Sequence, residues 1–224
     1  MKSRLAASDA LYLKPLVYGL DRTDSPFELV TDIPANNAVK LGERSEGIRI
    51  AFLSPIDYAR HGGEYCVVPD ICVASSSQTN TIQLVLKSSL RNIERVAIDV
   101  RFTSEIILAK IILSEKYRNQ PTHSTLQFIP MMPDVDAMLA KADAALLVQD
   151  HPQMLGREGT FTLDLVGEWN DLTGLPYVHG FWVGREEELS KREAQALLSA
   201  KKKRRSSEVA NSPKCRSAEK SFFR

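Results

Sequence analysis

Residues 99–117, DVRFTSEIILAKIILSEKY, join the end of a predicted strand to the start of a helix. The preceding run, 93–100, is apolar and partly β-branched, as in a buried strand. Thr103 and Ser104, with Glu105 just inside, are typical of a helix start, and apolar residues then recur at helical spacing up to Tyr117. The stretch therefore predicts a strand–helix unit.

The same alternation of short apolar runs and helical patterns continues on both sides of this unit. Further strands are predicted at 49–54, 65–68 (closed by Pro69), 81–86, 127–129, 142–148, 163–166 and 177–183. Further helices are predicted at 56–61 with Ser54 as cap, at 134–141 with Asp134 as cap, at 168–172 and at 186–200. This order predicts an α/β fold with a largely parallel sheet covered on both faces.

Composition and charge indicate which classes of binding partner to expect. The chain has 224 residues, 43% of them hydrophobic, and a net charge of +1, which gives no long-range field to gather nucleic acid or a membrane. The basic excess is concentrated in residues 201–224, which begin KKKRR, and the rest of the chain is acidic. No stretch approaches the ~20 apolar residues of a membrane helix, and the first residues do not resemble a secretory signal. We therefore expect a cytoplasmic protein that binds neither nucleic acid nor membranes.

The three cysteines, Cys66, Cys72 and Cys215, are too sparse for a disulfide framework and contain no CxxC pair. Cys66 and Cys72 have apolar neighbours, so we expect them to be buried. This usage fits a reducing compartment.

The helix start at Thr103 and Ser104 is the clearest candidate for a ligand site. The first N–H groups of a helix lack internal partners, and together with the helix dipole and two hydroxyls they form a receptor for an anion such as a carboxylate. The loop before it has no glycine, so it is neither a P-loop nor a Rossmann turn. The alternative interpretation is that Thr103 is only an N-cap.

Two other polar segments accompany it. Residues 75–81, SSSQTNT, include Asn80 and Thr81 and would by themselves be a solvated loop. Residues 171–182, DLTGLPYVHGFW, place His179 on a strand after a Gly-Pro bend, although a single His is more often structural than catalytic. No metal-ligand spacing and no Ser-His-Asp arrangement is visible, so we expect neither a metal nor a cofactor.

Taken in order, these segments resemble the menaquinone-biosynthesis family that contains chorismate dehydratase and its sister enzyme, dihydroxynaphthoate synthase. The resemblance runs from about Lys14 to about Glu188, and EWNDLTGLPYVHGFW at 168–182 is its most specific block. The stretch VVPDICVAS at 67–75 favours the chorismate dehydratase branch. Other matching blocks are PLVYGL at 15–20, AFLSPIDYARH at 51–61, residues 99–117, and PMMPDVDAMLAKADAALLV at 130–148.

The resemblance implies a two-lobed fold of the type II periplasmic-binding-protein kind, with a ligand cleft between the lobes. It places one lobe at 1–85, with 184–200 returning to it, and the other at 86–183. It also implies the removal of water from chorismate to give 3-[(1-carboxyvinyl)oxy]benzoate on the futalosine route to menaquinone, without a cofactor. The expected partner is a chorismate-like small carboxylate, and the oligomeric state is left open.

Carried over residue by residue, the resemblance places Ser54, Thr81, Thr103 and Ser104 on polar positions of the family's site. Tyr12 falls where the family usually has an Asn that is thought to take part in catalysis. The expected site therefore has Thr81 and Tyr12 as catalytic residues. Its expected substrate-binding residues are Ser54, Asn80, Thr103, Ser104 and His179.

Residues 201–224 depart from the family, whose members continue with helices that complete the first lobe. We expect this segment to be disordered or added to the fold, and its Lys run suggests a frameshift. A nucleic-acid-binding tail is the alternative. Three alternatives to the dehydratase stay open. The Tyr12 departure favours a non-catalytic binding protein for a small carboxylate, and the others are the sister synthase and a truncated, inactive product.

Overall fold

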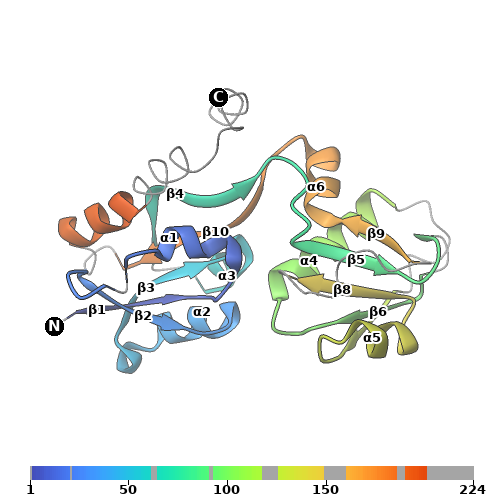
Figure 1. Cartoon of the computed structure of the whole chain (residues 1–224), viewed down its shortest axis with the longest axis horizontal. Helices are drawn as coiled ribbons and strands as arrows, with labels where there is room; N and C mark the ends of the chain where they lie inside the picture. Colours follow the sequence, from blue (N-terminus) through green and yellow to red (C-terminus); the bar gives the residue numbers. More distant parts are fainter. Residues whose placement is uncertain are drawn as a thin grey trace.

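The computed structural model describes residues 2–20, 22–61, 65–90, 93–117, 126–148, 160–185 and 190–200. Within these residues, two five-stranded sheets form two lobes that lie side by side (Figure 1). Helices pack on both faces of each sheet. The α/β class and the two-lobed architecture expected from the sequence are confirmed.

The first sheet has the order β2-β1-β3-β10-β4. β1 pairs in parallel with β2 and β3, whereas β10 is antiparallel to both β3 and β4. The strands are β1 (Ser3–Ala7), β2 (Phe27–Thr31), β3 (Ile48–Leu53), β4 (Cys66–Ser75) and β10 (Tyr177–Gly184).

The second sheet has the order β7-β6-β8-β5-β9. β6 is parallel to β7 and β8, and β5 is antiparallel to β8 and β9. The strands are β5 (Ile82–Leu86), β6 (Arg95–Ile98), β7 (Gln127–Pro130), β8 (Ala144–Val148) and β9 (Phe161–Asp164). The expectation of a largely parallel sheet is therefore wrong. In each lobe, the first strand after the chain arrives from the other lobe is antiparallel to its neighbours: β5 in the second lobe and β10 in the first.

Helices cover each sheet with separate hydrophobic cores. On the first sheet, α2 (Pro34–Gly42) and α3 (Pro55–His61) pack on one face, while η1 (Leu11–Leu13), α1 (Lys14–Val17) and the helix 191–200 pack on the other. On the second sheet, α4 (Thr103–Glu115) and α6 (Leu165–Thr173) share one face, and α5 (Val135–Lys141) covers the other. A short turn, η2 (Arg44–Glu46), leads into β3.

The chain crosses between the lobes twice, at 76–81 and at 174–176. The two crossings leave the first sheet side by side, because Ser75 at the end of β4 is paired with Tyr177 at the start of β10. Asn170 joins them by donating through Nδ2 to the carbonyls of Ser75 (3.4 Å) and Leu175 (2.7 Å). By sheet membership, the second lobe begins at β5 and the first resumes at β10. The boundaries expected at 85/86 and 183/184 both fall within these strands, and the division into lobes at those positions stays a prediction.

Several local expectations need correction. β4 continues through Pro69, and both Cys66 and Cys72 on it are exposed, because β4 is the edge strand of its sheet. The predicted strand at 163–166 ends at Asp164, since the Asp164 side chain caps α6.

The predicted helix at 186–200 is helical from 191. Ser190 and Glu193 form a capping box there, in which Glu193 Oε2 accepts from the Ser190 N–H (2.8 Å) and Ser190 Oγ accepts from the Glu193 N–H (3.3 Å). Residues 186–189 and the tail at 201–224 lie outside the described residues.

Across the parts of the chain that the structure describes, no helix is long and apolar enough to cross a membrane.

Candidate functional site

A pocket lies between the two lobes and draws its lining from both. Its space, including open solvent at the mouth, is about 360 Å³. Three helices begin at it: α2 at Pro34, α3 just after Ser54, and α4 at Thr103. The lining residues are Ser8, Tyr12, Pro34, Ala35, Phe52, Ser54 and Asp57 from the first lobe, Arg101, Thr103, Ser104 and Glu105 from the second, and His179 of β10.

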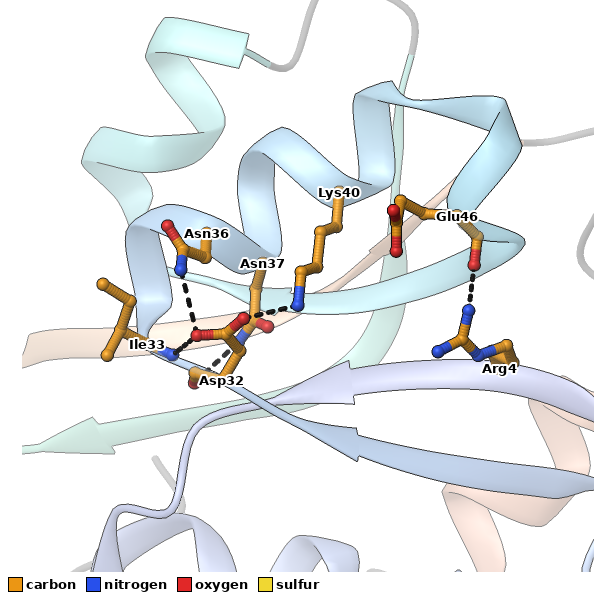
Figure 2. A network of polar contacts seen from close by, with 7 residues as sticks. All are labelled: Arg4, Asp32, Ile33, Asn36, Asn37, Lys40 and Glu46. Carbon is orange, nitrogen blue, oxygen red and sulfur yellow. Dashed lines mark hydrogen bonds and ion pairs between the residues drawn. The ribbon is translucent and has the colours of Figure 1, made fainter.

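The start of α2 is held in place by Asp32, which lies two positions before the first helical residue, Pro34. The Asp32 carboxylate accepts hydrogen bonds from the Ile33 N–H (2.7 Å) and Asn36 Nδ2 (3.0 Å) and pairs with Lys40 Nζ at 2.5 Å (Figure 2). The hydrogen bond from Lys40 lowers the pKa of Asp32. Figure 2 shows Lys40 reaching back along α2 to this carboxylate. Pro34 and Ala35, the first two residues of α2, line the pocket.

The start of α3 carries a reciprocal cap. Ser54 Oγ accepts the Asp57 N–H (3.1 Å) and donates to Asp57 Oδ2 (2.7 Å). Both side chains are buried, at 7% and 4% exposure. The expected role of Ser54 as the cap of this helix is confirmed, and the same cap brings the Asp57 carboxyl group into the pocket.

The start of α4 differs from its expectation. Phe102 is the N-cap residue and makes no side-chain cap, so Thr103 is the first helical residue and not the cap. Ser104 is buried, and its hydroxyl lies near that of Tyr177 on β10. The N-cap residue of this 13-residue helix, whose first turn reaches the pocket, therefore offers no side-chain hydrogen bond to the first N–H groups.

Arg101 is the cation that lines the pocket. Its guanidinium group pairs with Asp99, with Nε 2.9 Å from both carboxylate oxygens and Nη2 2.5 Å from Oδ2. This hydrogen bonding raises the pKa of Arg101. The side chain of Arg101 is 42% exposed, so the cation is neutralised on one side and accessible on the other.

Aromatic rings form the wall beside β10. The rings of Tyr12 and His179 lie 4.8 Å apart, and Tyr177 meets His179 edge-on at 5.0 Å. Burial raises the pKa of both tyrosines and lowers that of His179 to about 4. Ser75 Oγ lies 3.0 Å from His179 Nε2. All three rings are therefore neutral near pH 7.

A carboxyl group from each lobe lies in the pocket: Asp57 from α3 and Glu105 from α4. Glu105 is half-buried as a residue, and burial of its carboxyl group is the main influence on its pKa. That burial, with the nearby negative charge of Asp57, raises the pKa of Glu105 to about 7.

The crossing segment at 76–81 makes its own contacts. Thr81 Oγ1 lies 2.7 Å from Thr79 Oγ1, and Asn80, with a φ of 56°, accepts a hydrogen bond from Gln83 through Oδ1. Asp164 Oδ2 accepts the backbone N–H groups of Thr79 (3.2 Å) and Asn80 (2.5 Å). Neither Thr81 nor Asn80 is among the residues lining the pocket.

The structure thus brings together five of the seven site residues expected from the sequence: Tyr12, Ser54, Thr103, Ser104 and His179. The catalytic role expected for Thr81 and the binding role expected for Asn80 stay predictions. Sequence reasoning missed the lining residues Ser8, Asp57, Arg101 and Glu105 as site residues. The Ser-x-x-Asp spacing at 54–57 could have indicated Asp57.

Among the residues that the structure describes, no group of His, Cys, Asp and Glu is placed to hold a metal ion.

Comparison with known proteins adds the family. The model of the family described as "Menaquinone biosynthesis" matches residues 3–220. A chorismate dehydratase from Thermus thermophilus is 27% identical over 173 residues, which are 72% of this chain and 62% of that protein. The match therefore spans less than two thirds of that relative's length.

Solved structures share the fold. A protein from Archaeoglobus fulgidus is similar with a TM-score of 0.68 and 20% identity, covering 94% of this chain and 77% of that one. The periplasmic aliphatic sulphonate binding protein of Escherichia coli is similar with a TM-score of 0.60 and 14% identity, covering 92% of this chain and 75% of the other. Because the family match extends over nearly all of the sequence, the chain belongs to the menaquinone biosynthesis family.

Proposed function

We propose that this protein is a chorismate dehydratase-like hydro-lyase, which removes water from chorismate to give 3-[(1-carboxyvinyl)oxy]benzoate. The observation that carries the proposal is the inter-lobe pocket, lined by hydroxyls and by the starts of three helices, in a member of the menaquinone biosynthesis family. The chorismate dehydratase relative supports the choice of substrate. We place the reaction in the cytoplasm, on the futalosine route.

The pocket fits the binding of a carboxylate. The uncapped first turn of α4 presents backbone N–H groups, and the hydroxyls of Thr103 and Ser104 stand beside them. Ser54 and Arg101 add a hydroxyl and a cation on either side. Because the lining comes from both lobes, a ligand here touches both and can hold them together.

The chemistry demands little beyond positioning. A C–H bond and the C–O bond on the neighbouring ring carbon break, and the electrons left behind complete an aromatic ring. That gain in aromaticity supplies driving force, so the protein chiefly has to hold the two carboxylates and orient the proton that leaves. A carboxylate of the substrate can accept this proton, and the helix start stabilises negative charge as it develops.

Tyr12 has a limited part in this scheme. Burial raises the pKa of its hydroxyl, so it is neutral near pH 7 and suited to donating a hydrogen bond. Its ring lies against His179, which fixes its position on the pocket wall. We therefore assign Tyr12 to orienting the substrate and not to removing the proton.

The test is turnover by the full chain. Purified protein is mixed with chorismate, and product is followed by ultraviolet absorbance and by mass spectrometry for loss of one water. Glu94→Gln, an exposed change before β6, is the control variant and should retain full activity. A folded preparation that forms no more product than chorismate alone would rule out the dehydratase.

A second candidate function is the binding of a small carboxylate without chemistry. It is favoured by Tyr12, which stands where the family usually has Asn and which lies in the pocket. The fold is also shared with a periplasmic sulphonate binding protein. A shift of the melting temperature by chorismate without product would support this candidate.

A further inference from the structure

The pocket combines features that favour an anion with features that oppose one. The start of α4 and Arg101 attract negative charge, whereas Asp57 and Glu105 place two carboxyl groups in the same space. Asp57 is held by the cap of α3, in which Ser54 Oγ donates to Asp57 Oδ2 and accepts the Asp57 N–H. The carboxyl group of Glu105 lies near its own backbone N–H, which lowers its pKa less than burial raises it, and Glu105 lies one position from Ser104 in the first turn of α4.

We propose that Glu105 is a specificity-determining residue that binds the ligand carboxylate as a neutral carboxylic acid, so that the anion enters the pocket together with one proton. The inference rests on the proposed function for the identity of its ligand. In this arrangement the acid O–H donates to the ligand carboxylate. An ionised Glu105 would instead repel the ligand carboxylate at short range.

Of Glu105 and the titratable groups that face it, Glu105 is the one that we expect to change charge near neutral pH. From η1 comes Tyr12, and from β10 come Tyr177 and His179, all three neutral there because burial shifts their pKa values away from neutrality. Asp57 faces it from α3, and its negative charge helps to raise the pKa of Glu105. Arg101, from the loop before α4, stays charged beside Asp99. The raised pKa of Glu105 means that protonation near neutral pH is available to the free protein.

The experiment measures binding, which does not depend on turnover. The probe is 3-[(1-carboxyvinyl)oxy]benzoate, the product of the proposed reaction, titrated by calorimetry from about pH 6 to about pH 9 in buffers of different ionisation heat. For the wild type we expect Kd to rise about tenfold per pH unit above about 7, with close to one proton taken up per ligand. Glu105→Gln should bind with an affinity independent of pH, and about 100-fold more tightly than the wild type near pH 9.

Two further variants separate the role of Glu105 from a general effect on structure. Glu105→Asp keeps an ionisable group and should keep the proton uptake. Glu94→Gln removes a carboxylate from the exposed surface of the same lobe and should behave as the wild type. Melting temperatures identify any variant that has lost its fold.

The outcomes distinguish this role from the proposed function. Proton-coupled binding without chorismate turnover refutes the dehydratase and leaves the role of Glu105 in place. Binding whose pH dependence is unchanged by Glu105→Gln overturns that role, whether or not the protein is active. The absence of binding at every pH overturns the role of Glu105, and the dehydratase is then decided by the turnover assay alone.

Discussion

Asp164 joins three backbone groups from two separate segments, and its removal should therefore cost much more than the loss of an ordinary helix cap. Its Oδ1 caps α6 by accepting the Gly167 N–H at 2.7 Å. Its Oδ2 accepts the N–H groups of Thr79 and Asn80, in the segment that crosses between the lobes. Asp164 is 9% exposed, so water cannot readily replace it.

Asp134 offers a matched comparison, because its side chain caps α5 and, within the part of the chain that the structure describes, accepts only the Ala137 N–H, at 3.0 Å. Loss of an N-cap costs about 1 kcal/mol. Each further hydrogen bond lost from Asp164 adds about 1 kcal/mol. We therefore expect Asp164→Ala to lower the free energy of unfolding by about 3 kcal/mol. The expected loss for Asp134→Ala is about 1 kcal/mol.

Urea unfolding measures both losses. The chain has two tryptophans, Trp169 in α6 and Trp182 in β10, so fluorescence reports on both lobes. Circular dichroism on the same samples shows whether the lobes unfold together. Equal losses for Asp164→Ala and Asp134→Ala would refute the reasoning, because they would mean that the bonds to Thr79 and Asn80 contribute nothing.

Three further predictions concern the first lobe and the pocket. A Cβ at Gly180 would lie 2.4 Å from the Phe52 ring, so Gly180→Ala should lower the melting temperature strongly. A Cβ at Gly174 would have nothing within 4 Å, so Gly174→Ala should lower the melting temperature less. Equal shifts for the two variants would contradict the packing argument. His179 has its pKa lowered to about 4, so the stability that it contributes when neutral is present above its unfolded value of 6.5 and is lost as pH falls toward 4. His179→Asn should remove this fall in urea titrations, and a variant with an unchanged pH profile would refute it. The pKa shift of Glu105 has the opposite sign. The stability that neutral Glu105 contributes is present below its unfolded pKa of 4.5 and is lost as pH rises through about 7. Glu105→Gln should therefore flatten the decline in the wild-type free energy of unfolding over that range.

The sequence predicted the features that are set by neighbours along the chain. Ser54 before Pro55 and Asp134 before its apolar run marked two helix starts, because a cap and the N–H groups that it satisfies lie within one turn of each other. The Thr103–Ser104 helix start was predicted for the same reason. Its cap residue was wrong by one position, since Phe102 holds the N-cap without a side-chain bond.

Features that depend on distant segments were not predictable in the same way. The direction of β10 depends on its pairing with β3 and β4, which lie far from it in the sequence. The exposure of Cys72 depends on β4 lying at the edge of the sheet. Asp57 and Glu105 were overlooked as site residues because an acid in the first turn of a helix already has a local explanation, namely a favourable interaction with the helix dipole.

That local explanation and the site are two aspects of one arrangement. α3 and α4 begin at the pocket from opposite lobes, and each carries an acid in its first turn, where the dipole favours negative charge. A ligand carboxylate seeks the same positive helix ends, so it competes with the acids that stabilise the helices. Asp57 is held by the cap of α3, and moving its side chain away from the ligand would break that cap. Glu105 can lose its negative charge by taking up a proton. The protonation of this residue therefore decides whether the pocket accepts the ligand carboxylate.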